Sequence, residues 1–279
     1  MAEKRRFIQC DVFSSVPTKG NALAVVLDGE GLSDDQMQNF AAWTNLAETT
    51  FLLPPIDPGA DYRVRIFTPV REMLFAGHPT LGSCFSWLHG GGAPRNSSVV
   101  IQECKIGLVP IHIDGELPAF EAPPTEAEPL PDADFQRIRE MLGVPADRVV
   151  QTAKLTNGPV WQVLELKSAE DVLAADGTKT KWPEFTPIGL IGPHPPGSEC
   201  DYEVRMLAPS SGMLEDPITG SLNAALAQWL AAQGRLEGLV KTAQGTQIGR
   251  VGRVHIRPGG DKILIGGQTN LLIEGTVTL

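Results

Sequence analysis

The sequence predicts a mixed α/β fold made of two similar halves, each with a mainly antiparallel sheet and a helix. Three observations favour this fold class: a motif that recurs in the second half, many short apolar runs, and a Pro- and Glu-rich segment between the halves. The 279 residues suffice to bury two cores. We expect halves of 1–118 and 119–279, with the final strand, about 270–279, a candidate to return to the first half.

The internal repeat is the most informative of these observations. Its matches, in chain order, are DYRVRIFTPVREML (61–74) with DYEVRMLAPSSGML (201–214), PTLGS (79–83) with PITGS (217–221), and IGLVPIHI (106–113) with IGRVGRVHI (248–256). Three matches in the same order favour a duplication over a chance likeness between unrelated strand–turn–helix units.

Short apolar runs predict strands in both halves, because Gly, Pro or polar residues bound each run. In YRVRIFTP, Val64 and Ile66 alternate with Arg63 and Arg65, the period of two that is typical of a half-buried strand. The other runs are FIQCDVF, LAVVL, TTFLL, SVVIQ, GPVWQVLEL and KILIGG. This pattern favours antiparallel sheets over an alternating βαβ arrangement.

Helices are expected at fewer places. SDDQMQNFAAW predicts an early helix, since Ser33 and Gln36 have the spacing of a capping box. A further helix is expected after each repeated motif. In the second half, its apolar face comprises Leu222, Ala225, Leu226, Trp229 and Leu230. The Pro- and Glu-rich segment LPAFEAPPTEAEPLPDAD is expected to be an exposed linker between the halves.

Composition and charge exclude several classes of function. The formal net charge is -10, and beyond EKRR at the N-terminus the basic residues are scattered, so nucleic acid and membranes are not expected partners. No apolar stretch approaches the roughly 18 residues that span a bilayer. The four cysteines form no CxxC pair, which suits a reducing compartment. We therefore expect a cytoplasmic protein.

The two helix starts, GHPTLGS and DPITGS, are each suited to hold an anion. A helix N-terminus offers unpaired backbone N–H groups and the positive end of the helix dipole. Pro79 and Pro217 fit a first helical turn, and Gly77, Gly82 and Gly220 leave out a Cβ atom where a ligand approaches. Two similar halves make one cleft between them, so we expect a small-molecule carboxylate site there.

Three ionisable side chains are candidates for catalysis. His78 is either a functional residue or a helix cap or core histidine; the histidines lack HxH or HxxxH spacing, so no metal site is expected. Asp216 is either functional or an N-cap, where Asp is favoured. Glu48 follows a helical pattern and opens a β-branched run, so it is either an exposed strand-edge residue or a buried general base.

PTKGNALAVV, NLAETTFLL, RIFTPVREMLFAGHPTLG and LEDPITGS, in this order, resemble the phenazine-biosynthesis PhzF-like family. The resemblance extends over essentially the whole chain, since QGTQIGR and IEGTVTL are also similar, and FAGHP and EDxxTGS are its most specific parts. It implies the diaminopimelate-epimerase-like fold. In that fold each half is a strongly curved, mainly antiparallel sheet around a central helix, and the active site lies in the cleft between the halves.

The resemblance also implies roles for single residues. Glu48 matches the family's catalytic glutamate, which removes a proton from a substrate carbon and returns it elsewhere. His78 and Asp216 match residues that orient polar substrate groups and assist proton movement. The implied reaction is the isomerisation of a small carboxylate such as trans-2,3-dihydro-3-hydroxyanthranilate by a homodimer, with no cofactor. The substrate-binding positions that match are Gly77, Gly220 and Ser221.

The sequence also departs from the family pattern. Ala47 precedes Glu48 where a serine is common, and Ala22 replaces a proline after GN. Cys84 lies inside the expected first helix, so an epimerisation that uses two thiols is not expected. The alternatives are an epimerase, racemase or dehydratase in which Glu48 and Asp216 act from opposite faces, and a metabolite-binding protein without catalysis.

Overall fold

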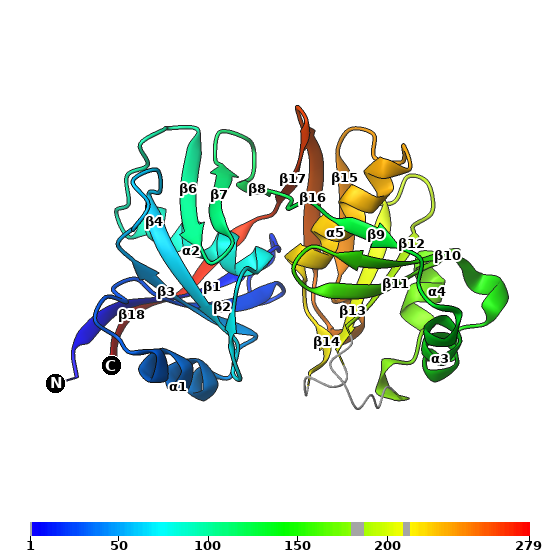
Figure 1. Cartoon of the computed structure of the whole chain (residues 1–279), viewed down its shortest axis with the longest axis horizontal. Coiled ribbons are helices and arrows are strands. Elements are labelled where there is room, and N and C mark those ends of the chain that lie inside the picture. Colours follow the sequence, from blue (N-terminus) through cyan, green and yellow to red (C-terminus); the bar gives the residue numbers. More distant parts are fainter. Residues whose placement is uncertain (1, 180–186, 209–212) are drawn as a thin grey trace. The chain divides into compact units, whose positions relative to one another are not determined.

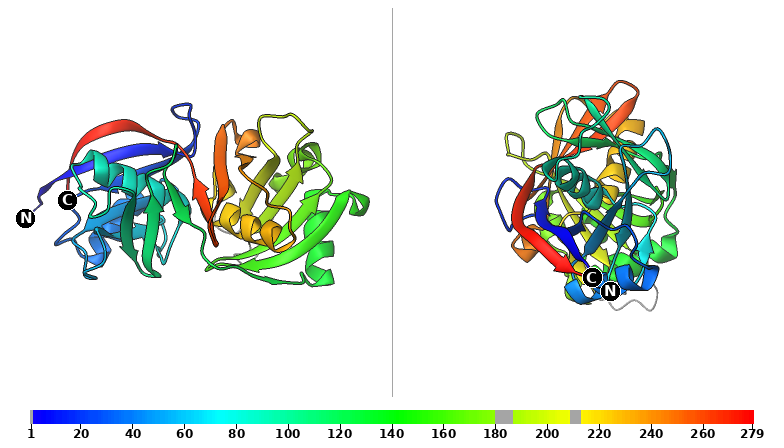
Figure 2. Two further views of the ribbon diagram at one scale, coloured as in Figure 1. Left: turned by 90° about the horizontal axis from the view of Figure 1, so that it is seen from above. Right: turned by 90° about the vertical axis from the view of Figure 1, so that its left-hand side faces the viewer.

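The computed structural model describes residues 2–179, 187–208 and 213–279. The chain divides into two compact units, Met1–Glu121 with Gly266–Leu279, and Ala122–Ile265. The last strand therefore belongs to the first unit. There β18 (Thr269–Thr278) runs antiparallel to β1 (Lys4–Val12), as the red and blue arrows of Figure 2 show.

The first unit contains one mixed, mainly antiparallel sheet and two helices that Figure 1 labels α1 and α2. The strand order is β18-β1-β2-β3-β4-β6-β7-β8, with β5 paired to β4; the pairs β2–β3 and β4–β6 are parallel. The remaining bounds are β2 Asn21–Val26, α1 Asp34–Thr44, β3 Glu48–Leu53, β4 Tyr62–Phe67, β5 Glu72–Met73, α2 Gly77–His89, β6 Val99–Cys104, β7 Gly107–His112 and β8 Ala119–Glu121.

The two helices of this unit lie on opposite faces of its sheet, because neighbouring strand residues point to opposite sides. On β3, the Thr50 hydroxyl accepts a hydrogen bond from Ser83 of α2 at 2.9 Å. The next residue, Phe51, contacts Phe40 of α1 with ring centroids 6.2 Å apart. A strand that is buried on both faces has a continuous apolar sequence and no alternation. This explains the composition of TTFLL in β3 and LAVV in β2.

The second unit repeats this plan. Its strand order is β9-β10-β11-β12-β13-β15-β16-β17, with β14 paired to β13; the pairs β11–β12 and β13–β15 are parallel. The bounds are β9 Glu126–Glu128, α3 Asp132–Leu142, η1 Ala146–Arg148, β10 Val149–Thr156, β11 Val160–Leu166, α4 Ala169–Ala174, η2 Gly177–Lys179, β12 Ile188–Pro193, β13 Tyr202–Ala208, β14 Met213–Asp216, α5 Gly220–Ala232, β15 Val240–Gln244, η4 Thr246–Ile248, β16 Gly252–Gly259 and β17 Lys262–Gly266.

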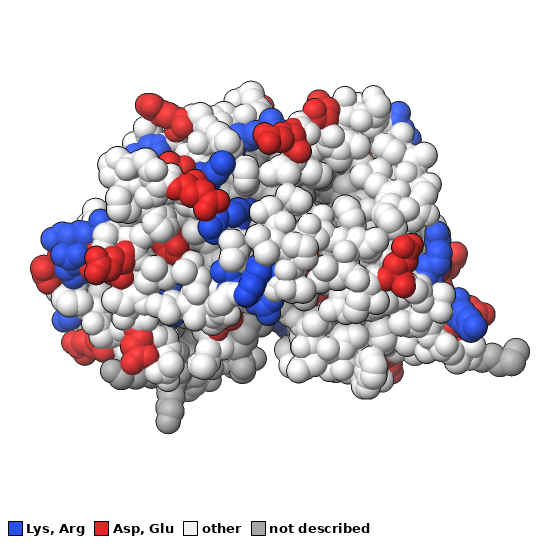
Figure 3. Space-filling view, turned by 180° about the vertical axis from the view of Figure 1, so that it is seen from behind, with Lys and Arg blue, Asp and Glu red and all other residues white. Residues whose placement is uncertain are grey.

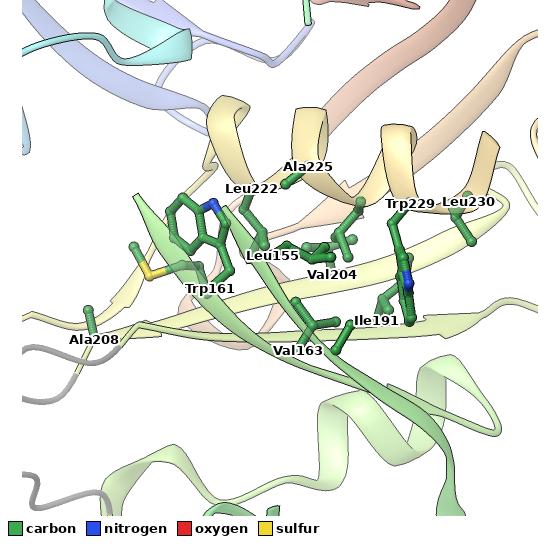
Figure 4. Packing of buried hydrophobic residues seen from close by; sticks show 13 residues of the cluster. Leu155, Trp161, Val163, Ile191, Val204, Ala208, Leu222, Ala225, Trp229 and Leu230 are labelled. Carbon is green, nitrogen blue, oxygen red and sulfur yellow. The ribbon is translucent and has the colours of Figure 1, made fainter. Parts of the chain in front are cut away.

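A core covers each face of the second sheet. Val163 belongs to the cluster under α5, whereas its neighbour Leu164 belongs to the cluster under α3 and α4. Figure 4 shows α5 above the strands, with Leu222, Trp229 and Leu230 pointing from the helix toward them. The helical face predicted from the sequence is thus confirmed. It packs α5, which begins at Gly220 within DPITGS, against the sheet.

Both units share one order of elements: β1-β2-α1-β3-β4-β5-α2-β6-β7-β8 corresponds to β10-β11-α4-β12-β13-β14-α5-β15-β16-β17. The first repeated residue has the same role in each unit. Asp61 Oδ2 accepts the N–H of Ile101 at 2.8 Å, and Asp201 Oδ2 accepts the N–H of Lys241 at 2.8 Å. The structure therefore confirms the duplication, although residues 209–212 of the second motif lie outside the described residues.

Local predictions about helices and the linker have different outcomes. The capping box is confirmed: the Ser33 hydroxyl accepts from the N–H of Gln36 at 3.2 Å, and the Gln36 side chain accepts from the Ser33 N–H at 3.0 Å. The linker prediction is right only in part. The boundary between the two units, at Glu121/Ala122, lies within LPAFEAPPTEAEPLPDAD, and residues 126–129 are exposed. The segment also contains β8 and β9, however, and Ala119 and Phe120 are buried.

Candidate active site

Glu48 and His78 come together in the first unit. Asn45 ends α1 in a left-handed conformation, and the chain then turns so that Glu48 is the first residue of β3. His78 is the second residue of α2. The imidazole Nε2 lies 3.3 Å from Glu48 Oε2, and the two side chains are 4% and 16% exposed. The predicted alternative of an exposed strand-edge Glu48 is therefore wrong.

Asn21 at the start of β2 holds the other side of the imidazole. Its Nδ2 lies 3.3 Å from His78 Nδ1. Burial lowers the pKa of His78 from 6.5 to about 3, and a hydrogen bond with the backbone of Ala22 offsets only part of that effect. Desolvation disfavours the charged imidazole, so His78 is neutral near pH 7. The 3.3 Å approach of Nε2 to Glu48 Oε2 lacks the geometry of a hydrogen bond.

The first turn of α2 has no side-chain cap. Ala76 is the N-cap residue, which excludes the prediction that His78 itself caps the helix. The first helical hydrogen bond runs from Thr80 N–H to Ala76 C=O at 3.2 Å. Pro79 has no N–H, and the N–H groups of Gly77 and His78 precede the first hydrogen bond of the helix. This end of α2 has the chemistry of an anion site.

Asp216 lies in the second unit at the end of β14, directly before α5. The alternative that it caps this helix is wrong, because Thr219 is the N-cap residue. The Thr219 hydroxyl does not cap the helix either, since it donates its hydrogen to Asp216 Oδ2. Pro217 precedes the N-cap and so lies outside the first turn that the sequence predicts for it.

Gly220 and Ser221 are the first two residues of α5, the positions that Gly77 and His78 occupy in α2. The first helical hydrogen bond runs from Asn223 N–H to Thr219 C=O at 3.0 Å, so the N–H groups of Gly220 and Ser221 precede the ladder here too. The second unit thus gathers Asp216, Gly220 and Ser221 at one helix end.

Gly77 begins α2 as Gly220 begins α5, so one match of the sequence repeat needs correction. PTLGS and PITGS align Gly82 with Gly220, but Gly82 lies in the second turn of α2 whereas Gly220 begins α5. A Cβ atom on Gly82 would lie 2.5 Å from Leu23 Cδ2 and 3.0 Å from Cys10 Sγ. Gly82 therefore permits close packing of α2 against the sheet, not the approach of a ligand.

Several residues that hold the candidates in place are not predicted from the sequence. Asn21, Thr219 and Gln244 lie in the quoted stretches PTKGNALAVV, LEDPITGS and QGTQIGR, but nothing in their spacing indicates a role. In addition, Asn157 donates to the Ser221 C=O at 2.8 Å and accepts from Trp161 Nε1 at 2.9 Å. Such contacts between distant segments leave no periodic signal in the sequence.

Other surface features lie away from these residues. Two hollows of the first unit, of about 390 Å³ and 720 Å³, are lined by neither Glu48 nor His78. Acidic and basic side chains are interspersed on the face in Figure 3. Ion pairs also join opposite charges, such as Arg65 with Glu72 at 2.8 Å. Among the described residues, no His, Cys, Asp and Glu side chains gather in a metal-binding group. No helix in the described ranges is long and apolar enough to cross a membrane.

Comparison with known proteins identifies the family. The profile of PhzC-PhzF, described as "Phenazine biosynthesis-like protein", matches residues 10–275. The chain belongs to the PhzC-PhzF family. A relative in Schizosaccharomyces pombe, "Antisense-enhancing sequence 1", is 33% identical over 96% of this chain and 97% of its own. The trans-2,3-dihydro-3-hydroxyanthranilate isomerase of Pseudomonas aeruginosa is 32% identical over 91% of each chain.

Solved structures of the PhzC-PhzF family have the same fold. The Bacillus anthracis phenazine biosynthesis protein of the PhzF family superimposes with a TM-score of 0.83 at 21% identity, covering 99% of this chain and 100% of that one. The predicted fold class is confirmed by this likeness. The predicted enzyme class, an isomerase, is confirmed by the named relatives in the family.

Proposed function

We propose that this PhzF-family isomerase moves a proton between two carbons of a small, unsaturated carboxylate, with Glu48 as the acid–base group. The approach of His78 Nε2 to within 3.3 Å of Glu48 Oε2 carries the proposal. A carboxylate held beside a neutral imidazole at a helix N-terminus has a partner for its proton and N–H donors for a substrate anion.

One glutamate suffices for both steps. Its carboxylate removes a proton from a carbon next to the unsaturated or carboxylate-bearing carbon, and the carboxyl group formed returns that proton to a second carbon on the same face. Because the isomerisation involves no net oxidation or reduction of the substrate, it needs no redox cofactor. The N–H groups of Gly77 and His78 stabilise the negative charge that develops on the substrate.

The residues of the second unit complete the proposed machinery. Asp216 exchanges a proton with a polar substrate group, while Ser221 and the N–H of Gly220 bind the substrate. We further propose a homodimer, on the family resemblance of the sequence, and a cytoplasmic location, on its four cysteines without a CxxC pair. Light scattering coupled to size-exclusion chromatography tests the assembly: a mass near twice 30.0 kDa supports it, and a mass near 30.0 kDa overturns it.

The reaction is tested with trans-2,3-dihydro-3-hydroxyanthranilate, the compound in the name of the Pseudomonas aeruginosa relative. Ultraviolet spectra follow its conversion by the wild type and by Glu48→Gln. Turnover by the wild type and a loss of roughly 10²–10⁴-fold in the variant support the proposal. Equal rates would exclude Glu48 as the acid–base group, and an inactive wild type would exclude this substrate.

Solvent deuterium separates the isomerase from its alternatives. If a double bond migrates, the product has the double bond at a new position, and deuterium enters the carbon that receives the proton only as far as the Glu48 proton exchanges with solvent before it is returned. Inversion at a single carbon would instead indicate an epimerase or racemase, and loss of water a dehydratase. Equal metabolite binding by the wild type and Glu48→Gln, with turnover by neither, would favour a protein that binds without catalysis.

A further inference from the structure

A chain of buried hydrogen bonds joins Gln244, at the end of β15, to the carboxylate of Asp216. Gln244 Nε2 donates to the Thr219 hydroxyl oxygen at 3.0 Å, and the Thr219 hydroxyl donates to Asp216 Oδ2. Gln244 is fully buried, and Thr219 and Asp216 are 7% and 6% exposed. Bulk water therefore does not decide the direction of these bonds.

The orientation of the Gln244 amide is fixed by groups that only donate. Its Oε1 accepts the backbone N–H of Thr219 at 3.0 Å. It also accepts Asn223 Nδ2 at 2.9 Å, and this nitrogen is identified by its second bond, to the C=O of Thr219 at 3.0 Å. A flipped amide would set nitrogen against two donors, so Nε2 is the atom that faces Thr219.

The amide orientation fixes the hydroxyl of Thr219. Gln244 Nε2 has two hydrogens, and the acceptors within reach are the Asp216 C=O at 3.3 Å and the Thr219 hydroxyl oxygen at 3.0 Å. A hydroxyl has one hydrogen. With Nε2 donating to its oxygen, Thr219 directs that hydrogen at Asp216 Oδ2.

We propose that Gln244 is a positioning residue for Asp216: acting through Thr219, it makes Oδ2 a constant hydrogen-bond acceptor, so that Oδ1 is the oxygen that carries and transfers the proton. This inference depends on the proposed function only for the step in which Asp216 transfers a proton to or from the substrate. A proton on Oδ2 would turn the Thr219 hydrogen away from the carboxyl group and break this hydrogen bond. Protonation at Oδ1 keeps both hydrogen bonds, the one from Gln244 to Thr219 and the one from Thr219 to Asp216.

The first unit contains a similar pair of a buried glutamine and a threonine, but its hydrogen bonds end at a backbone carbonyl. Gln102 Nε2 donates to the Thr80 hydroxyl at 3.1 Å, and that hydroxyl donates to the C=O of Ala76 at 2.9 Å. Gln102 is fully buried, as Gln244 is. Because this chain ends at a carbonyl and not at a carboxylate, Gln102 provides a control for the effect of removing a buried glutamine.

The test is a pH titration of the Asp216 carboxyl carbon by ¹³C NMR in the substrate-free protein, with Asp216→Asn used to assign the resonance. Thr219→Val removes the hydroxyl at nearly constant volume and is expected to raise the titration midpoint by about one pH unit, since a lost donor destabilises the carboxylate. Thr219→Ser restores the donor and is expected to titrate as the wild type does. Gln244→Met is expected to shift the midpoint upward by less, because the hydroxyl is then free to rotate.

The outcomes separate this inference from the proposed reaction. An unchanged midpoint in Thr219→Val or in Gln244→Met, or a shift of the same size in Gln102→Met, would overturn it. If Thr219→Val does not fold, the titration midpoints of Gln244→Met, Thr219→Ser and the wild type are compared. A midpoint that is higher in Gln244→Met than in the other two supports the inference, and equal midpoints overturn it. The NMR titration needs no substrate, so an inactive wild type would refute the proposed reaction while leaving the titration result standing.

Discussion

His78 Nε2 lies 3.3 Å from Glu48 Oε2, although the two residues begin different elements of the first unit. Glu48 opens β3, which runs parallel to β2 with Leu23 opposite Glu48. His78 opens α2, which contacts both strands. The amino ends of three elements therefore meet, and Asn21 at the start of β2 lies within 3.3 Å of the imidazole.

Asn21→Ala is expected to reduce kcat by roughly 10- to 100-fold, because the imidazole loses the group that orients it. The rate with trans-2,3-dihydro-3-hydroxyanthranilate and the ¹⁵N shifts of the His78 ring, which report the tautomer, are the measurements. Asn270→Ala is the control, since the Asn270 side chain donates to the C=O of Ser14 at 2.6 Å and so tests the loss of a different asparagine hydrogen bond in the same unit. A variant with wild-type ring shifts and rate would contradict the role of Asn21.

The buried imidazole should make the protein less stable in acid. His78 has a pKa of about 3 when folded and 6.5 as a free side chain, so between these values the unfolded chain binds a proton that the folded protein excludes. The free energy of unfolding therefore falls as the pH is lowered from about 6.5 toward 3. We expect His78→Asn to weaken this dependence in urea titrations across pH.

His112→Asn is the matched control for that experiment, because His112 is 29% exposed and lies 3.2 Å from Glu121 in the same unit. Its removal should leave the steep loss of stability between pH 6.5 and 3. Identical pH dependence in His78→Asn and the wild type would show that His78 titrates normally in the folded protein.

Gly82→Ala is expected to destabilise the first unit by about 1–3 kcal/mol, because the new Cβ would overlap Leu23 Cδ2, at 2.5 Å, in a packed core. Urea denaturation measures the change. In Gly275→Ala the new methyl group meets nothing within 4 Å, so a change within about 0.5 kcal/mol is expected. If Gly82→Ala kept full stability but lost ligand binding, a direct role at the site would replace the packing role.

Leu222→Ala should destabilise the second unit by roughly 2–5 kcal/mol, since it opens a cavity where α5 contacts the sheet. Trp161 and Trp229 lie in the same cluster, so their fluorescence reports the unfolding directly. Leu239→Ala is the control, because Leu239 is 52% exposed. Equal losses of stability from both substitutions would be inconsistent with the cluster that Figure 4 shows.

Much of the fold follows from local patterns. The period of two in YRVRIFTP, the capping box at Ser33 and the helical face that includes Leu222 each depend on residues close in the sequence, and all three are present in the structure. Where composition was the only guide, the prediction was right about the boundary between the units but not about the exposure of the whole segment. The prolines around Phe120 indicated a linker, yet that residue is buried beside Phe75 with ring centroids 5.6 Å apart.

The sequence by itself determined the duplication, the strand-rich halves and the residue types at the two helix starts, because these are properties of periodicity and chain order. Only the tertiary structure decided that Glu48 lies beside His78, that Thr219 rather than Asp216 is the N-cap, and that Gln244 orients the Thr219 hydroxyl. Each of these depends on side-chain direction between segments far apart in the chain. Such contacts are set by strand register and helix packing, which no local pattern encodes.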